Sequence, residues 1–146
     1  MTQRIQIKVS GHPAPQGSKR HVGNGVMVES SKKVKPWREA VVRAAREAMG
    51  GDAPLDGPLR LSVRFFMPRP QSHYRANGEL KPWAPVYVDR QPDLSKLIRS
   101  TEDALTTAGL WSDDARVAAV LALKRYCGRE RWTGAVIEVR ELEVTS

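Results

Sequence analysis

The sequence predicts an α/β domain of the α+β type, with a single layer of mixed sheet of about four strands and two main helices packed on it. One observation is strand-like apolar patterning in four segments, at residues 3–9, 58–67, 115–126 and 134–144. Another is helical spacing of apolar residues in two segments, at residues 36–49 and 93–107. A third is size, because 146 residues of which 40% are hydrophobic suit one core. We therefore expect a single domain over residues 1–146.

The segment after the first strand predicts a loop followed by a hairpin. Residues 11–20 are dense in glycine, proline and basic residues, which is typical of a loop. Residues 21–28 carry Asn24-Gly25 between apolar residues, and this dipeptide is a strong signal for a tight hairpin turn.

The first helix is expected to begin at Pro36, since proline is favoured in a first helical turn, and to end at Gly50-Gly51. Its apolar residues predict one inner face, formed by Trp37, Ala40, Val41, Ala44, Ala45 and Ala48. Trp37 and, further along the chain, Trp111 are interpreted as core anchors.

The second half of the chain predicts a strand, a long loop and a second helix. Residues 68–85 are rich in proline and show no periodicity, so they read as a loop, which is often functional at this length. Residues 86–89 suggest a short extended segment. Asp93 can cap the second helix, and Gly109 stands near its end. The inner face of this helix is predicted to hold Leu94, Leu97, Ile98, Thr101, Ala104 and Leu105.

The charge of the chain is unevenly placed. The net charge is +8, and residues 1–46 carry ten Lys or Arg and two acids, whereas residues 47–146 carry fourteen of each sign. A segregated basic region favours a polyanionic partner, because each neutralised phosphate releases condensed counterions. The alternative is a protein with a basic face and no ligand. We expect nucleic acid as the partner.

Several classes of protein do not fit the composition. The single cysteine, Cys127, allows no intrachain disulfide, and His12, His21 and His73 lack the spacing of a zinc motif. No phosphate-binding glycine loop or dinucleotide fingerprint is present. No apolar run approaches a membrane span, and the N-terminus alternates like a strand rather than a signal peptide. We expect a soluble, cytoplasmic protein without a membrane partner.

Three acids gather where elements are predicted to meet. Asp93 precedes the second helix, and Asp113 and Asp114 precede the third strand. Mg²⁺ prefers oxygen ligands, often one or two carboxylates together with substrate phosphate. Without a cation, carboxylates beside a DNA phosphate would only repel it, so acids within a basic protein indicate metal chemistry. The structural alternatives are an ordinary helix cap and a solvated turn.

The same segment resembles the signature of the RusA family of Holliday junction resolvases. The matching stretches are Asp93-Leu-Ser-Lys-Leu-Ile-Arg, Asp103-Ala-Leu-Thr and Gly109-Leu-Trp-Ser-Asp-Asp. Gly11-His-Pro-Ala-Pro-Gln-Gly-Ser-Lys and Lys35-Pro-Trp-Arg are similar to the first loop and first helix of the family. The resemblance implies a homodimer that binds four-way junctions and cuts two strands symmetrically with Mg²⁺, or with Mn²⁺ in its place. Such an enzyme acts in DNA recombination and repair.

The resemblance carries the metal-binding acids of the family onto Asp93 and Asp114. Two positions depart from the pattern, because Ser95 stands where the family has its second Asp and Arg99 where it has Lys. A hydroxyl is a weaker ligand than a carboxylate, so a further acid is expected to compensate, and the candidates are Asp113, Asp89 and Glu102, with Asp113 first. Lys96 and Arg99 are the expected catalytic cations, which would neutralise charge on the phosphate.

Chain geometry limits how Asp93 and Asp114 can meet. The predicted helix is about 21 Å long at 1.5 Å per residue, and the seven residues 108–114 span at most about 25 Å. Asp114 can return to Asp93 only along a nearly straight path. We expect one intrachain site per subunit; the alternative is a site shared between two subunits.

DNA contacts are expected from basic residues of the first third and of the long loop. These are Lys19, Arg20, Lys32, Lys33, Lys35, Arg69 and Arg75. His73 and Tyr74 are candidates for stacking on an unpaired base at the crossover. Two other functions stay open at this point: a branched-DNA-binding protein with a weak or inactive site, and a less selective metal-dependent nuclease.

Overall fold

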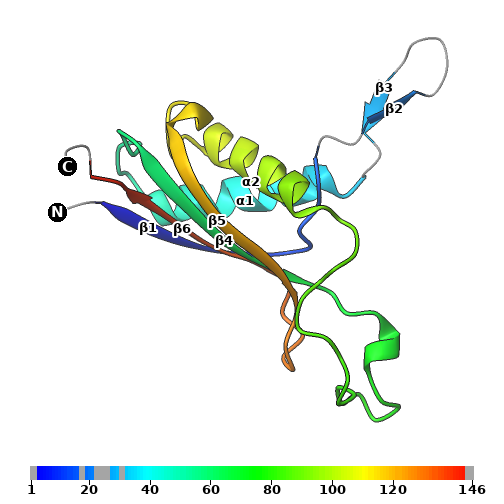
Figure 1. Ribbon diagram of the computed structural model, residues 1–146. Helices are drawn as coiled ribbons and strands as arrows, with labels where there is room; N and C mark the ends of the chain where they lie inside the picture. The colour runs from blue at the N-terminus through cyan, green and yellow to red at the C-terminus, as the bar shows by residue number, and fades with distance from the viewer. Residues whose placement is uncertain (1–2, 17–18, 22–26, 30–31, 144–146) are drawn as a thin grey trace.

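The computed structural model describes residues 3–16, 19–21, 27–29 and 32–143 (Figure 1). Its centre is a four-stranded mixed sheet in the order β1-β6-β4-β5, made of β1 (Arg4–Ser10), β6 (Gly134–Glu141), β4 (Leu59–Met67) and β5 (Val117–Tyr126). Both helices lie on one side of this sheet, α1 (Val34–Met49) and α2 (Leu94–Ala108). The expected α+β fold, with one mixed sheet and two main helices, is confirmed.

The alternation of buried and exposed residues along the strands shows which face of the sheet the helices cover. In β4 the odd-numbered residues from Leu59 to Met67 are buried, and the even-numbered ones are more exposed. β4 pairs antiparallel with β6 and parallel with β5, and β1 pairs antiparallel with β6, so residues opposite one another share a face. One face therefore packs against the helices, and the other is open.

Two tryptophans join the helices to the core through hydrogen bonds as well as packing. Trp37 of α1 is 1% exposed and donates from Nε1 to Oγ1 of Thr101 on α2 at 3.2 Å. Trp111 is also 1% exposed and donates to Oγ1 of Thr106 at 2.7 Å. A buried indole N–H needs such a partner. Both tryptophans are the core anchors that the sequence predicts.

The hairpin is present but begins earlier than predicted. β2 (Lys19–His21) pairs antiparallel with β3 (Met27–Glu29), so Lys19 and Arg20 belong to a strand rather than to the loop. The turn at Asn24-Gly25 lies outside the described residues.

The first helix also differs in detail from its prediction. It begins at Val34, two residues before Pro36. Ala48, placed on the inner face by its spacing, is exposed near the end of the helix, whereas its neighbour Met49 packs against the core. Gly50 ends the helix as predicted, with its amide donating to the Arg46 carbonyl at 3.1 Å.

The long loop is held more firmly than its sequence indicates. Residues Gln71–His73 form a short 3-10 turn, η1. Further on, the Tyr126 amide donates to the Val86 carbonyl at 2.8 Å, and the Val88 amide donates to the Lys124 carbonyl at 3.3 Å. These bonds attach residues 86–88 to the outer edge of β5, where the sequence suggests a short extended segment. In the described part of the chain, no helix is long and apolar enough to cross a membrane.

Candidate active site

Asp93 occupies the N-cap position of α2 without capping it. Its backbone is extended, with φ −64° and ψ 135°, but its side chain accepts no capping hydrogen bond. The carboxylate instead lies 3.7 Å from Nζ of Lys96, and the two side chains are 47% and 39% exposed. The cap role expected of this side chain is therefore wrong. Its oxygens remain accessible at the end of a helix where the dipole favours negative charge.

Two loops and a strand fix the position of this helix end. The Gln16 amide donates to the Lys96 carbonyl at 3.1 Å, and Ser100 Oγ donates to the Ala14 carbonyl at 2.7 Å. The Nζ of Lys124, on β5, donates to the carbonyls of Arg90 at 2.5 Å and Pro92 at 2.7 Å. The first loop and the segment before Asp93 are thus tied to one end of α2.

A cleft of about 530 Å³ opens beside this helix end. Residues 12–15 of the first loop, residues 68–70 and residues 90–92 form most of its walls. Lys33, Arg69 and Arg90 are among its lining residues, so cations from three separate segments border a cleft whose wall ends one residue before Asp93.

Asp113 and Asp114 lie in and before a 3-10 turn, η2 (Asp114–Arg116), that leads into β5. Asp113 Oδ1 accepts the Ala115 amide at 2.9 Å, and this bond, with a second to Asp114, lowers the pKa of Asp113. The bond with Asp113 raises the pKa of Asp114, and desolvation and the charges of Asp113 and Asp103 act in the same direction. Asp114 thus stands in a negative potential that a bound cation would relieve.

Glu102 and Asp103 of α2 extend this acidic group. Burial raises the pKa of Glu102, and the charges of Asp114 and Asp103 raise it further. Glu102 is half-buried, whereas Asp89, the other expected compensating acid, is 92% exposed beside Arg90. Of the two, Glu102 is the one that lies near Asp114.

The structure does not bring Asp93 and Asp114 together within one chain. Asp93 directly precedes α2, whereas Asp114 lies near Glu102 and Asp103 in the second half of this helix, whose 15 residues extend about 22 Å. Along β5, Lys124 beside the Asp93 end is separated from Val117 by seven residues, or about 23 Å. Within the described ranges, no three His, Cys, Asp or Glu side chains converge to hold a metal ion. The described residues therefore give no support to an intrachain site, because Asp93 lies at the start of α2 and Asp114 lies beside its second half.

The other predicted residues of the second helix lie on its first turns. Ser95 and Arg99 are exposed, and their spacing of four places them on one helical face. Lys96 is half-buried beside Asp93. Both cations therefore lie within two turns of the Asp93 carboxylate, as the sequence predicts.

The expected DNA-contacting cations divide into three groups. Lys32, Lys33 and Lys35 are exposed at and just before the start of α1. The side chains of Lys19 and Arg20 lie outside what the structure describes. In the long loop Arg75 is exposed, but Arg69 donates to the carbonyls of Cys127 at 2.8 Å and Pro85 at 2.7 Å. Arg69 therefore holds the loop together, which its sequence context did not reveal.

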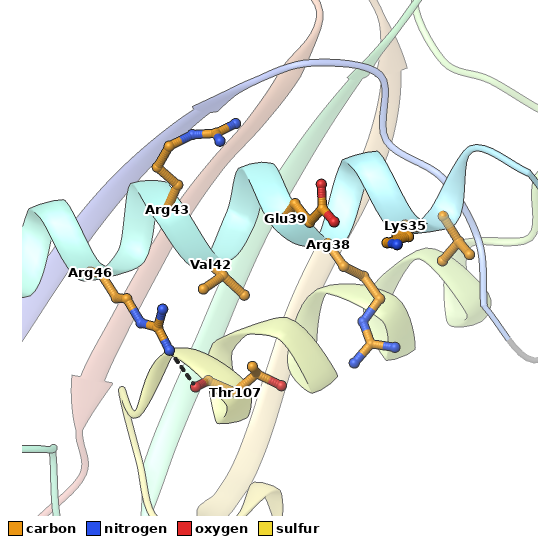
Figure 2. A pocket seen from close by; sticks show the side chains of 8 residues that line it. Lys35, Arg38, Glu39, Val42, Arg43, Arg46 and Thr107 are labelled. Carbon is orange, nitrogen blue, oxygen red and sulfur yellow. Dashed lines mark hydrogen bonds between the residues drawn. The ribbon is translucent and has the colours of Figure 1, made fainter.

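Sequence reasoning missed a groove along the outer side of α1 (Figure 2). The groove has a volume of about 590 Å³ and an apolar floor of Val34 and Val42. Basic side chains surround it, and Lys35 is accompanied by Arg38, Arg43 and Arg46. Arg46 donates to the Thr107 carbonyl of α2 at 3.4 Å. The helical spacing of these arginines was the available signal, and it continues the Lys32–Lys35 patch along the helix.

The aromatic residues of the long loop are arranged differently from the prediction. His73 and Tyr74 are 7% and 8% exposed, so neither is free to stack on a base. Trp83 and Tyr87 are instead 60% and 64% exposed. The edge of His73 meets the Trp83 ring at 5.6 Å, and Lys81 Nζ lies 5.5 Å from its centroid. The stacking candidates of this loop are therefore Trp83 and Tyr87.

Comparison with known proteins places these features in a family. A search of curated proteins finds no match. The family model of the endodeoxyribonuclease RusA matches residues 10–140, a span that includes the first loop, both helices and both groups of acids. The chain therefore belongs to the RusA endodeoxyribonuclease family, hydrolases that act on DNA as Holliday junction resolvases.

Proposed function

We propose that this resolvase is a homodimer that cuts two related strands of a four-way junction symmetrically, with Mg²⁺ or Mn²⁺ held by Asp93 and Asp114. Asp113 and Glu102 are the further acids available to the site. The observation that carries the proposal is the half-exposed carboxylate of Asp93, which pairs with Lys96 and directly follows Pro92 in the wall of a cleft bordered by cations.

The carboxylates of Asp93 and Asp114 are donors that suit a hard divalent cation, and sharing between subunits would let both bind one ion. Mg²⁺ needs one or two carboxylates and takes its other ligands from water and phosphate. Asp114 has a raised pKa among neighbouring acids, which favours a bound cation there. When bound, the cation would activate water and offset charge on the phosphodiester.

A two-fold pairing of β5 edges would bring the two acids together. β5 is an edge strand, and residues 86–88 are attached to its edge beside Lys124 and Tyr126, so the stretch that begins at Val117 is the part offered to a partner. Its first end adjoins Asp114, and Lys124 near its other end holds the segment before Asp93. An antiparallel pair of such edges places the start of one strand beside the end of the other. Asp114 of one subunit would then approach Asp93 of the partner subunit at each end of the pair.

The remaining residues of the site would position the substrate and neutralise its charge. Lys96 and Arg99, on the first turns of α2, are placed to contact the phosphate that Asp93 approaches. The exposed Lys32, Lys33, Lys35 and Arg75, and the groove arginines of α1, would hold the arms of the junction. A DNA substrate and a lone cysteine also suit the reducing cytoplasm as the place of action.

A synthetic four-way junction tests the proposal. The wild-type protein should cut opposite strands in the presence of Mg²⁺ or Mn²⁺, and Asp93→Asn should bind the junction but cut at least about a hundredfold more slowly. Asp89→Asn is the matched control, because Asp89 is an exposed acid four residues away. Equal loss in both variants would contradict the role of Asp93.

Ser95 is the one observation that favours a second candidate, a junction-binding protein with a weak or inactive site, because it replaces an expected carboxylate. Tight binding without cleavage under both metals would establish that candidate. Cleavage rates on junction, flap, duplex and RNA substrates, measured at one stated salt concentration, separate the resolvase from a less selective nuclease.

A further inference from the structure

The open face of the sheet carries an unbalanced set of cations. Strand register places on this face, opposite the helices, six basic side chains, those of Arg4, Lys8, Arg60, Arg64, Arg125 and Arg140. Glu138 is the one acid that the register of the four described strands places among them. Six positive charges therefore face one negative charge on a surface that no helix covers.

Three of the arginines form a row across neighbouring strands. Arg4 pairs with Arg140, and Arg140 pairs with Arg60, so their side chains lie next to one another. All three approach Glu138, at 3.8 Å from Arg4, 3.9 Å from Arg60 and 3.5 Å from Arg140. Like charges directly opposite each other destabilise a sheet, and one carboxylate offsets only part of that repulsion. The row is therefore suited to an anion from outside the chain.

Aromatic rings accompany the cations at the other end of the same face. The Phe66 and Trp132 rings are 5.3 Å apart. Lys8 Nζ lies 4.7 Å from the Trp132 centroid, and the Arg125 guanidinium lies 5.5 Å from that of Phe66. Cations interleaved with aromatic rings are typical of surfaces that follow a nucleic-acid backbone.

We propose that this open face is a second DNA-binding surface, which holds the sugar-phosphate backbone of a junction arm; the inference rests on the action of the family on DNA. A second copy of the chain is the poorer occupant, because two faces with this excess of positive charge would repel each other. A sheet face of this kind contacts phosphates rather than base edges, so its binding should not depend on sequence.

The open face and the candidate active site meet at the same end of β5, on opposite sides of the sheet. Arg125 belongs to the open face, whereas its neighbour Lys124 points to the helix side and holds the carbonyls of Arg90 and Pro92. An arm on the sheet would therefore reach the edge of the fold close to Asp93. Pairing of β5 edges would also join the open faces of two subunits into one surface.

Junction binding measured in EDTA over a series of salt concentrations tests the inference without any need for cleavage. Arg64→Ala and Lys8→Ala each remove one exposed cation from the face, and Arg129→Ala removes an exposed arginine from a turn outside it. Each face variant should lower the slope of log K against log salt by about 0.9, whereas the control should keep the wild-type slope. The decrease in slope should be the same for junctions of different sequence.

Three outcomes would overturn the inference. In the first, the face variants keep the wild-type slope of log K against log salt. In the second, the Arg129→Ala control lowers this slope as much as the face variants do, which would show that only the net charge of the protein matters. Loss of the dimer in Arg64→Glu, measured by sedimentation, would instead assign the face to a second copy. If the face variants lower the slope as expected but the wild-type protein does not cut the junction with Mg²⁺, the proposed function is refuted and this inference is still supported.

Discussion

At the scale of single residues, the candidate site is short of negative charge. Ser95 is exposed on the first turn of α2, where the helix dipole would favour a carboxylate. Further acids lie beside the second half of α2, where burial and the charge of Asp114 raise the pKa of Glu102 and a hydrogen bond with Asp113 raises the pKa of Asp114. Negative charge is therefore available near Asp114 rather than at position 95.

Ser95→Asp should strengthen the site. An outer-shell partner alone is worth about 10–100-fold in metal affinity, so an added ligand should lower the Mg²⁺ concentration for half-maximal cleavage by roughly tenfold. Metal titration of junction cleavage measures the change. Ser95→Asn, which adds similar bulk without charge, is the control, and an equal response in both variants would show that charge is not the cause.

His73 gives the fold a dependence on pH. Burial lowers the pKa of His73 from its ordinary 6.5, and the charges of Arg69, Arg90 and Lys81 add to the effect. Because the unfolded chain binds this proton more readily, stability is full above pH 6.5 and falls as pH decreases below it, by at most about 1.4 kcal/mol per pH unit. His73→Phe should flatten the free energy of unfolding between pH 5 and 7, as urea titrations would measure. Parallel pH profiles for the two proteins would refute this role.

At the scale of elements, the conformation of segments with periodic apolar residues could be predicted from the sequence. The conformation of loops held by contacts from distant segments could not. The apolar spacing of Trp37, Val41 and Ala45 determines which face of α1 is buried, so that helix follows from its own sequence. The long loop has no such pattern. Arg69 and His73 are held there by carbonyls and rings from distant segments, and such contacts leave no local signal.

Lys124 shows how one strand residue positions the loop before the site. Lys124→Met keeps the apolar stem but removes both bonds to the Arg90 and Pro92 carbonyls. A shift of about 1 Å in reacting groups can reduce turnover by a hundredfold, so we expect cleavage to slow by roughly tenfold or more while junction affinity changes little. Single-turnover cleavage at saturating protein measures this. Lys81→Met, which alters a lysine of the long loop, should leave the rate nearly unchanged.

At the scale of the whole molecule, the candidate acids could be proposed from the sequence, but their positions in the fold could not. The motif around Asp93 and Asp114 identifies both acids, and the length of the predicted helix already showed that one chain reaches between them only with difficulty. The course of residues 108–114 could not be predicted, because it depends on tertiary contacts such as the Leu55 amide donating to the Leu110 carbonyl at 2.8 Å. A site divided between subunits then becomes the arrangement that the geometry favours.

Mixing two inactive variants tests that arrangement directly. Asp93→Asn and Asp114→Asn should each be inactive alone, because every shared site would lack one acid. After unfolding and joint refolding, half of the dimers are mixed, and each mixed dimer has one site with both acids intact and one site with neither. The mixture should therefore recover about one quarter of the wild-type nicking rate, as cuts in one strand rather than two. An intrachain site would leave every site defective, so a mixture as inactive as its components would refute the shared site.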